Sequence, residues 1–258
     1  LASLPVDSTA SQHLQIEAMK LAFADVYRYV SERSTMEVTT EQMLDDAYLA
    51  SRARLIDMRR AQDFQAGNPV KGGTIYLTAA DESGMMVSFI QSNYMGFGSG
   101  CVEPHYGISL QNRGYGFSLD AASPNVVAPG KRPFHTIIPA FLTKDGQPVM
   151  SYGVMGGNMQ PQGHMQTLVR MLDYRQGLQA ACDAPRWRFN KGLNINVEAA
   201  MNAATVQGLK DLGHEIDVIN DSYQDFGAGQ FIWRAGNPAV EGYVAASDPR
   251  RDGLAAGY

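Results

Sequence analysis

One threonine in this sequence directly follows two glycines, an arrangement that favours attack of the chain on its own backbone. Gly72-Gly73-Thr74 comes after a polar segment, residues 59–71, that is predicted to be a linker or exposed loop. Without a bulky side chain at Gly73, the carbonyl carbon before Thr74 is open to the threonine hydroxyl. A threonine at the start of a strand is structural far more often than catalytic, so this junction needs support from elsewhere in the sequence.

A second glycine pair, Gly156-Gly157, lies between a predicted strand and a predicted helix. Paired glycines in that position can direct backbone amides at an anion, as an oxyanion hole requires, although a simple turn is the alternative. The glycine-rich segment 96–100 opens no helix and lacks the lysine of a phosphate-binding loop, so we interpret it as a tight turn or bulge.

The histidines and cysteines do not predict a metal site or a cofactor. No histidine pair has the HExxH or HxH spacing, and the two cysteines, Cys101 and Cys182, form no CxxC pair. We expect them to be buried free thiols, with a disulfide between them as the alternative. His105 and His135 fall in loops beside glycine or proline and are better site candidates than the other three. The five histidines are His13, His105, His135, His164 and His214.

Composition describes an ordinary globular chain. The sequence has 258 residues, of which 45% are hydrophobic and 18% charged, with a formal net charge of −5. Without a basic patch the chain has no electrostatic footprint for nucleic-acid binding. No apolar run reaches the roughly 18 residues of a membrane-spanning helix.

The first seventy residues are predicted to be helical. Thr9 with Gln12 and Thr39 with Gln42 have the spacing of capping boxes at two helix starts. Between them, apolar residues recur at three- and four-residue intervals and predict one buried helix face. Its members are Leu14, Ala18, Leu21, Ala22, Val26, Tyr29 and Val30, and Leu44, Tyr48 and Leu55 continue the pattern in a second helix.

Beyond residue 73 the pattern changes to hairpins followed by mixed elements. Residues 74–80 and 85–91 predict one hairpin, and residues 137–143 and 148–152 predict another around Asp145-Gly146. Antiparallel sheets with helices on their faces follow, an α+β layered architecture. Helices are also predicted at 162–174 and 199–212, and strands at 214–219, 230–234 and 242–246.

With these features in order, the sequence resembles the γ-glutamyltranspeptidase family of N-terminal nucleophile (Ntn) hydrolases over essentially its whole length. The resemblance rests on several motifs in their family order rather than on any one of them. They are Gly73-Thr74, Ala79-Ala80-Asp81, Phe97-Gly98-Ser99-Gly100, Gly107-Ile108, Asn112, Ala128-Pro129-Gly130-Lys131-Arg132-Pro133, Gly153-Val154-Met155-Gly156-Gly157, Asp183-Ala184-Pro185-Arg186, Ala246-Ser247-Asp248-Pro249-Arg250 and Ala256-Gly257-Tyr258.

The resemblance implies a four-layer αββα sandwich and autoproteolysis between Gly73 and Thr74. Residues 1–73 then correspond to the C-terminal part of the large (α) subunit, and residues 74–258 to the small (β) subunit with its N-terminal nucleophile. Thr74 is expected to attack an amide carbonyl, with Ser92 supporting it and the amides of Gly156 and Gly157 stabilising the oxyanion. The family uses no metal or cofactor for this reaction.

Departures from the family pattern concern the substrate. The acidic residue that holds the α-amine of a γ-glutamyl group is replaced by Gly116, and a glutamine that binds the same end by Arg113. The paired serines that bind the α-carboxylate are His135-Thr136, and the asparagine expected after Ser92 is Tyr94, with Asn93 beside it. A guanidinium favours a carboxylate, although a structural ion pair is the alternative role for Arg113.

We therefore expect an amidohydrolase that cleaves the amide of a small acidic acyl group without an α-amine. Glutaryl amides, as in the cephalosporin acylase branch of the family, and oxamate both fit. The alternatives are a γ-glutamyltransferase or glutathione hydrolase and an uncleaved, non-catalytic homologue. Expected partners are the acidic amide substrate, the missing large-subunit portion and a possible second copy, with no nucleic acid and no membrane. A small catabolic substrate favours the cytoplasm over the periplasm.

Overall fold

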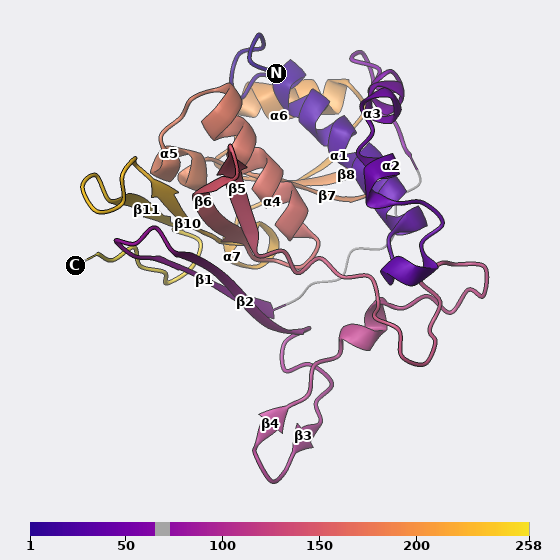
Figure 1. Ribbon diagram of the computed structural model, residues 1–258. Helices are drawn as coiled ribbons and strands as arrows, with labels where there is room; N and C mark the ends of the chain where they lie inside the picture. The colour runs from indigo at the N-terminus through magenta and orange to yellow at the C-terminus, as the bar shows by residue number, and fades with distance from the viewer. Residues whose placement is uncertain (65–72, 258) are drawn as a thin grey trace.

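The computed structural model describes residues 1–64 and 73–257 (Figure 1). The predicted linker 59–71 therefore lies outside the described residues from position 65 onwards. The chain has an α+β architecture in which helices pack on several small sheets. Among the helices of this described part, none combines the length and apolarity needed to cross a membrane.

The helical elements come first and then alternate with strands. A capping box at Thr39 and Gln42 is confirmed, whereas the cap of the first helix is Ser8, one residue before the predicted Thr9. The predicted second helix is two helices, because Asp45 caps a new start. The elements are α1 (Thr9–Tyr29), η1 (Arg33–Thr35), α2 (Thr40–Met43), α3 (Asp46–Ala53), η2 (Arg113–Gly116), α4 (Met159–Leu168), the π-helical continuation η3 (Val169–Asp173), α5 (Leu178–Asp183), α6 (Ala203–Asp211) and α7 (Ser222–Asp225).

The strands form four sheets. Both predicted hairpins are confirmed, as are the three predicted C-terminal strands. The strands are β1 (Gly73–Ala80), β2 (Met86–Tyr94), β3 (Val102–Glu103), β4 (Ile108–Ser109), β5 (Ala140–Lys144), β6 (Gln147–Val154), β7 (Trp187–Lys191), β8 (Asn194–Glu198), β9 (Glu215–Ile219), β10 (Gly229–Arg234) and β11 (Tyr243–Ser247). Their orders are β1-β2, β11-β10-β6-β5, β3-β4 and β7-β8-β9, with only β8 and β9 parallel among these ladders.

The four-stranded sheet is covered on both faces. On one face, Met150, Val154 and Phe231 pack against Leu178 and Cys182 of α5. The β1-β2 hairpin lies across the other face (Figure 1). There the ring of Tyr76 fits over Gly153, where a Cβ atom would lie 2.6 Å from the ring. The glycine therefore allows the hairpin to pack closely on β6.

A second core lies between α1 and the three-stranded sheet. Ile16, Met19 and Phe23 pack against Trp187 and Ile195. This buried face of α1 differs from the predicted one, since Ala18 and Ala22 are exposed. The prediction was wrong because the buried face also contains charged and polar residues, which a search for apolar periodicity passes over. They are Ser11, Gln12, His13, Gln15, Glu17 and Lys20.

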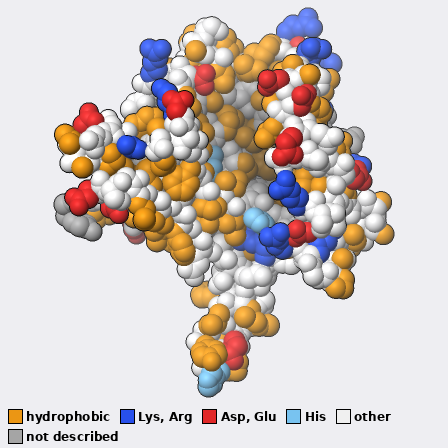
Figure 2. All heavy atoms as spheres, viewed as in Figure 1, with side chains coloured by type: hydrophobic (Ala, Val, Ile, Leu, Met, Phe, Trp, Pro, Cys, Tyr) orange, Lys and Arg blue, Asp and Glu red, His pale blue; other side chains and the backbone are white. Residues whose placement is uncertain are grey.

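Two strands, β3 and β4, form a finger that projects from the body of the molecule (Figures 1 and 2). Apolar side chains cover much of it, with Phe97 and Tyr106 among the most exposed. The segment 96–100 is a turn at its base, as predicted. Cys101 on this finger is exposed, so the expected burial is wrong for this cysteine, while Cys182 is buried and both thiols are free.

Candidate active site

The β1-β2 hairpin brings the two predicted hydroxyl residues together. Gly73 pairs with Tyr94 and Ile75 with Gln91, so Thr74 lies opposite a β-bulge that Ser92 and Asn93 form in β2. Bulges redirect side chains, and they occur often beside active sites. The Thr74 Oγ1 hydroxyl donates a hydrogen bond to Ser92 Oγ at 3.2 Å.

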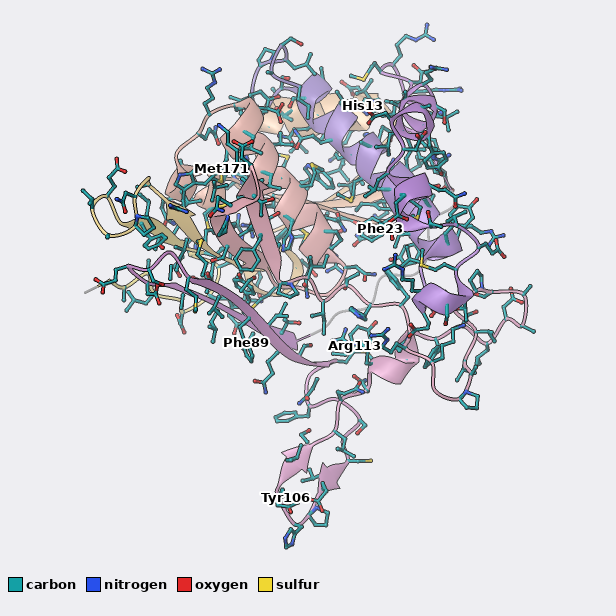
Figure 3. All side chains as sticks on the ribbon, viewed as in Figure 1. His13, Phe23, Phe89, Tyr106, Arg113 and Met171 are labelled. Carbon is teal, nitrogen blue, oxygen red and sulfur yellow. The ribbon has the colours of Figure 1, made fainter. Side chains whose placement is uncertain are left out.

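Arg113 reaches the same serine from the loop that follows the finger (Figure 3). Its Nη2 group donates to Ser92 Oγ at 3.1 Å, and its Cζ atom lies 4.5 Å from the ring centroid of Tyr94. The backbone amide of Tyr94 also donates to Ser92 Oγ, at 2.9 Å. Partial burial lowers the pKa of the Arg113 guanidinium, which nevertheless stays charged in any physiological solution. The Arg113 cation and the Thr74 hydroxyl group are therefore bonded to the same oxygen, Ser92 Oγ.

The loop between β6 and α4 holds the predicted oxyanion amides. Gly156 and Gly157 have φ angles of +115° and +62°, which favour glycine. A Cβ atom on Gly156 would lie 3.0 Å from the Cα atom of Gly227, so the first glycine is also required sterically. The amide of the preceding Met155 is fixed by the carbonyl of Ala228 at 2.8 Å.

Neither glycine amide in this loop donates a hydrogen bond to another described residue. Two adjacent amides without an internal acceptor are available to an anion at this position. The backbone of this loop therefore has the geometry that the proposed role of Gly156 and Gly157 requires.

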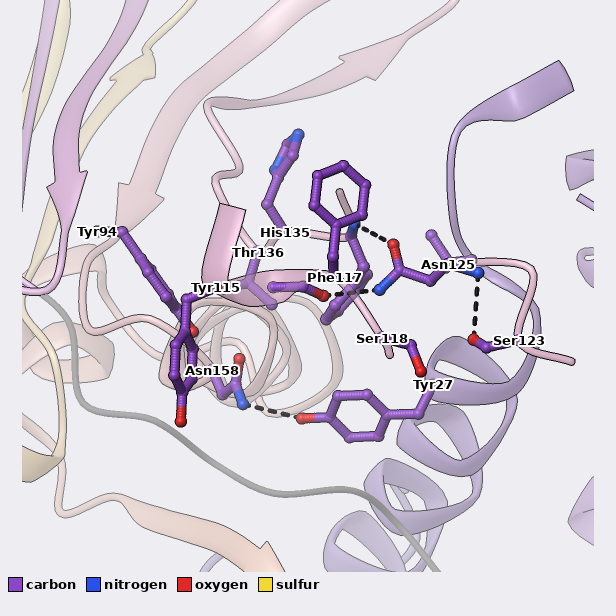
Figure 4. A pocket seen from close by; sticks show the side chains of 13 residues that line it. Tyr27, Tyr94, Tyr115, Phe117, Ser118, Ser123, Asn125, His135, Thr136 and Asn158 are labelled. Carbon is purple, nitrogen blue, oxygen red and sulfur yellow. Dashed lines mark hydrogen bonds between the residues drawn. The ribbon is translucent and has the colours of Figure 1, made fainter. Parts of the chain in front are cut away.

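A cavity of about 380 Å³ lies beside these groups (Figure 4). Figure 2 shows this face of the molecule hollowed, with basic side chains near the lower end of the hollow. The lining is mainly aromatic and neutral polar. It consists of Tyr27, Val30, Tyr94, Tyr115, Gly116, Phe117, Ser118, Ser123, Asn125, Phe134, His135, Thr136 and Asn158.

His135 and Thr136 line this cavity, as predicted for substrate-binding residues. Burial, with the nearby positive charges of Arg113 and Arg132, lowers the pKa of the His135 imidazole. The imidazole is therefore neutral at neutral pH and can offer one donor and one acceptor. Gly116 also lines the cavity, and a Cβ atom there would lie 2.7 Å from the carbonyl oxygen of Phe134. The backbone thus has no room for the acidic side chain typical of the family.

Asn93 follows Ser92 in the bulged end of β2. Burial alternates along β2 as far as Gln91, but Ser92, Asn93 and Tyr94 are all partly buried because the bulge interrupts the alternation. Like Thr74, Ser92 and Arg113, Asn93 lies beside the cavity and is not among the residues that line it. Its predicted substrate contact remains a prediction.

Several lining residues were not predicted, and Tyr27 and Asn158 are two of them. Tyr27 comes from α1, and its hydroxyl accepts a hydrogen bond from Asn158 Nδ2 at 2.8 Å. Asn158 directly follows the glycine pair, which is a signal that the sequence offered. Tyr27 lies outside every family motif and about fifty residues before Thr74, so nothing in the sequence linked it to the site.

One buried group has residue types that suit a metal ion, although its hydrogen bonds argue against one. Among the described residues, ligand atoms of His13, Glu17 and His214 lie within 4.8 Å of one another (Figure 3 labels His13). The buried Lys20 Nζ donates to Glu17 Oε1 at 2.8 Å and contacts His214 Nδ1 at 3.4 Å. The imidazoles join through His214 Nε2 and His13 Nδ1 at 2.8 Å, and His13 Nε2 donates to the carbonyl of Asp57 at 3.0 Å.

This chain of bonds uses all three Lys20 protons, since the third goes to the carbonyl of Gln62 at 3.1 Å. A metal ion bound here would have to displace the Lys20 ammonium group and the protons of the two hydrogen bonds that join His214 to Lys20 and to His13. We therefore assign the group to structure, where it ties the segment 57–62 to α1 and to the start of β9.

The comparisons with known proteins agree with these observations. The family model for γ-glutamyltranspeptidase matches residues 1–258. The chain is 37% identical over 257 residues to the oxamate amidohydrolase proenzyme of Klebsiella pneumoniae, covering 98% of this chain and 48% of that protein. It is 33% identical over 222 residues to the acylase ACY 1 proenzyme of Pseudomonas sp. strain SE83, covering 84% of this chain and 39% of that protein.

Among solved structures, cephalosporin acylase from Bacillus halodurans superimposes with a TM-score of 0.91 at 48% identity. The match covers 98% of this chain and 46% of that one. The chain thus spans about half the length of the relatives it matches. The family model, the sequence identities and the shared architecture together show that the chain belongs to the γ-glutamyltranspeptidase family.

Proposed function

We propose that this chain is the nucleophile-bearing half of a proenzyme that cleaves its own Gly73–Thr74 bond and then hydrolyses the amide of a small acidic acyl group. The observation that carries the proposal is the convergence of Thr74 Oγ1 and Arg113 Nη2 on Ser92 Oγ. It joins a candidate nucleophile to a fixed cation through a single oxygen. The family to which the chain belongs supports the amidohydrolase class.

Self-cleavage is the first step of the proposed mechanism. The Thr74 hydroxyl oxygen attacks the carbonyl carbon of Gly73, the C–N bond breaks, and the nitrogen takes the hydroxyl proton. Water then hydrolyses the resulting ester, which leaves a carboxyl group on Gly73 and a free α-amine on Thr74. Ser92 helps here because its hydrogen bond holds the hydroxyl in place at the bulge.

Substrate hydrolysis reuses the same hydroxyl. The new α-amine, with a pKa near ~8 in model compounds, takes the hydroxyl proton directly or through water. The oxygen attacks the substrate carbonyl, the amine product leaves with the proton, and water releases the acid from the acyl-enzyme. The amides of Gly156 and Gly157 stabilise the tetrahedral oxyanion, and one such donor typically contributes about 3–4 kcal/mol.

Arg113 and Gly116 together favour an acyl group that carries a carboxylate and no α-amine. The guanidinium can pair with a carboxylate, and none of the described residues that line the cavity is an Asp or Glu that would meet an ammonium group. The names of the relatives in Klebsiella and Pseudomonas, an oxamate amidohydrolase and an acylase, point the same way. We therefore place an oxamate-like or glutaryl-like acyl group in the cavity, and His135 and Thr136 add neutral hydrogen-bonding groups.

Two further proposals concern architecture. The outer face of the β1-β2 hairpin is apolar and uncovered in this chain, with Ile75, Leu77 and Phe89 between 47% and 68% exposed. Such a face needs a covering layer. We propose that the remainder of a large subunit covers it and completes a four-layer αββα sandwich. Residues 1–73 then form the end of that subunit, and residues 74–258 form the small subunit.

The substrate proposal is tested by assaying the processed protein on oxamate, a glutaryl amide and a γ-glutamyl anilide side by side. Faster hydrolysis of either of the first two, lost in Arg113→Ala, supports it. A preference for the γ-glutamyl anilide that Arg113→Ala leaves unchanged overturns it, and would instead support a γ-glutamyltransferase.

A further inference from the structure

The last turn of α1 carries a tyrosine that contacts the glycine loop. The ring of Tyr27 stacks on Phe23 with centroids 5.5 Å apart and meets Phe134 edge-on at 5.6 Å. These two neighbours fix the ring and direct its hydroxyl group to Asn158, as Figure 4 shows. Burial raises the pKa of the Tyr27 phenol, so the hydroxyl keeps its proton at neutral pH.

Asn158 is the residue through which this contact reaches the loop. It occupies the N-cap position of α4, directly after Gly157. Its backbone already has helical angles, φ −67° and ψ −7°, whereas a capping asparagine has an extended backbone, so the side chain makes no cap bond. It donates to Tyr27 instead. The side chain therefore links the residue that follows the glycine pair to α1 through one long-range hydrogen bond.

The glycine loop is consequently held at both ends. At its start, the amide of Met155 is bonded to the carbonyl of Ala228 at 2.8 Å. At its end, Asn158 is bonded to Tyr27 at 2.8 Å. The two glycines lie between these points, and the contacts on either side maintain their positive φ angles. Catalytic donors act best when they are fixed before the reaction begins.

We infer that Tyr27 is a positioning residue for the oxyanion amides, acting through Asn158. The inference rests on the proposed role of Gly156 and Gly157. Tyr27 precedes the Gly73–Thr74 junction, so after cleavage the hydroxyl that orders this loop comes from the other polypeptide product. Turnover on Thr74 then depends on residues 1–73 remaining docked on the cleaved protein.

The test compares Tyr27→Phe, Asn158→Ala and the double variant in the full-length proenzyme. Tyr27→Phe keeps the ring and its packing and removes only the hydroxyl. The matched control is Tyr29→Phe on the same helix, whose ring lies beside Arg28 and does not line the cavity. Amide hydrogen exchange in segment 155–158, thermal stability, kcat and KM are measured for each variant.

We expect faster exchange in this segment for Tyr27→Phe and a kcat about tenfold lower, the size of one lost hydrogen bond. KM should change less than twofold, and the double variant should be no slower than Asn158→Ala alone. The control should match wild type. Unchanged exchange overturns the inference whether or not the protein has activity. Faster exchange with an unchanged kcat, or additive losses in the double variant, also overturns it. A wild-type protein that hydrolyses none of the substrates contradicts the proposed function, while the exchange data still decide whether Tyr27 orders the loop.

Discussion

The guanidinium of Arg113 lies 3.1 Å from Ser92 Oγ, the oxygen that also accepts the Thr74 hydroxyl. This contact places a permanent positive charge beside the residue that cleavage would turn into an N-terminal amine. A nearby cation disfavours a second one, so it lowers the pKa of that amine and increases the fraction available as a base. One side chain would then serve both the substrate carboxylate and the nucleophile.

Replacing Arg113 with alanine should therefore have two separable effects. Loss of the carboxylate partner should raise KM for an acidic acyl amide roughly 10- to 100-fold, the size of a hydrogen bond to a charged group. Loss of the cation should move the acidic limb of the kcat/KM profile upwards by about 0.5–1 pH unit. Steady-state kinetics from pH 5 to 10 measures both. Arg113→Lys, which keeps the charge, should restore the position of the limb. A limb that stays in place in Arg113→Ala would contradict the proposed coupling.

Ser92→Ala should slow self-cleavage by about tenfold, because Thr74 loses the hydrogen-bond partner that holds its hydroxyl. Ser88→Ala provides the control. Ser88 lies on the same face of β2 and bonds to the Tyr76 hydroxyl at 2.7 Å, away from the junction. A time course on denaturing gels follows the cleavage of both variants. Equal rates in the two would rule out a specific role for Ser92.

The sequence predicted the hairpins and the residues at the junction, because their signals are local. Turn residues and alternating side chains located β1, β2, β5 and β6 within a few positions. It missed α5 and the β7-β8 pair, whose short segments show little alternation because Trp187, Arg188 and Phe189 are all buried in succession. The buried charges of α1 misled the face prediction, since Lys20 is acceptable inside only with partners from distant segments.

At the site, motif positions alone located Thr74, Ser92 and Arg113. The contact among them depends on the bulge in β2 and on the loop that returns Arg113 to this strand, and neither has a sequence signature. The role of Tyr27 could not be predicted from the sequence for the same reason. Its partner Asn158 lies 131 positions away, and only tertiary packing brings the two together.

His164 predicts how stability depends on pH. Its Nε2 accepts the amide of Val154 at 2.9 Å, and burial lowers the pKa of this imidazole to about 4 from 6.5. Below pH 6.5 the unfolded chain takes up a proton that the folded chain refuses, so this contribution to stability is full above 6.5 and is lost as the pH falls towards 4. Thermal unfolding at pH 7, 5.5 and 4.5 should show this decline. His164→Gln should make the decline shallower, the remainder coming from His214, whose pKa burial lowers to about 3, and His105→Gln on the exposed finger should not. An equal slope in His164→Gln and wild type would contradict the assignment.

The uncovered face of the hairpin makes a prediction about assembly. Leu77 and Phe89 pair across β1 and β2 on that face. Changing both to threonine should destabilise the full-length protein by about 2–3 kcal/mol, because their burial against the rest of the large subunit is lost. The same double change in residues 1–258 alone should have little effect. Chemical denaturation of the two lengths measures the difference. Equal effects in both lengths would argue against a covering layer at this face.

The central claim is cleavage between Gly73 and Thr74 by the Thr74 hydroxyl, and intact-mass spectrometry of the purified full-length protein tests it most directly. We expect the wild type to yield a small-subunit product that begins at Thr74, and Thr74→Ala to remain whole under the same conditions. Thr74→Ser, which keeps a hydroxyl, should still be cleaved. A wild-type protein that stays as intact as Thr74→Ala, or a Thr74→Ala variant that is cleaved at the same bond, would contradict the account.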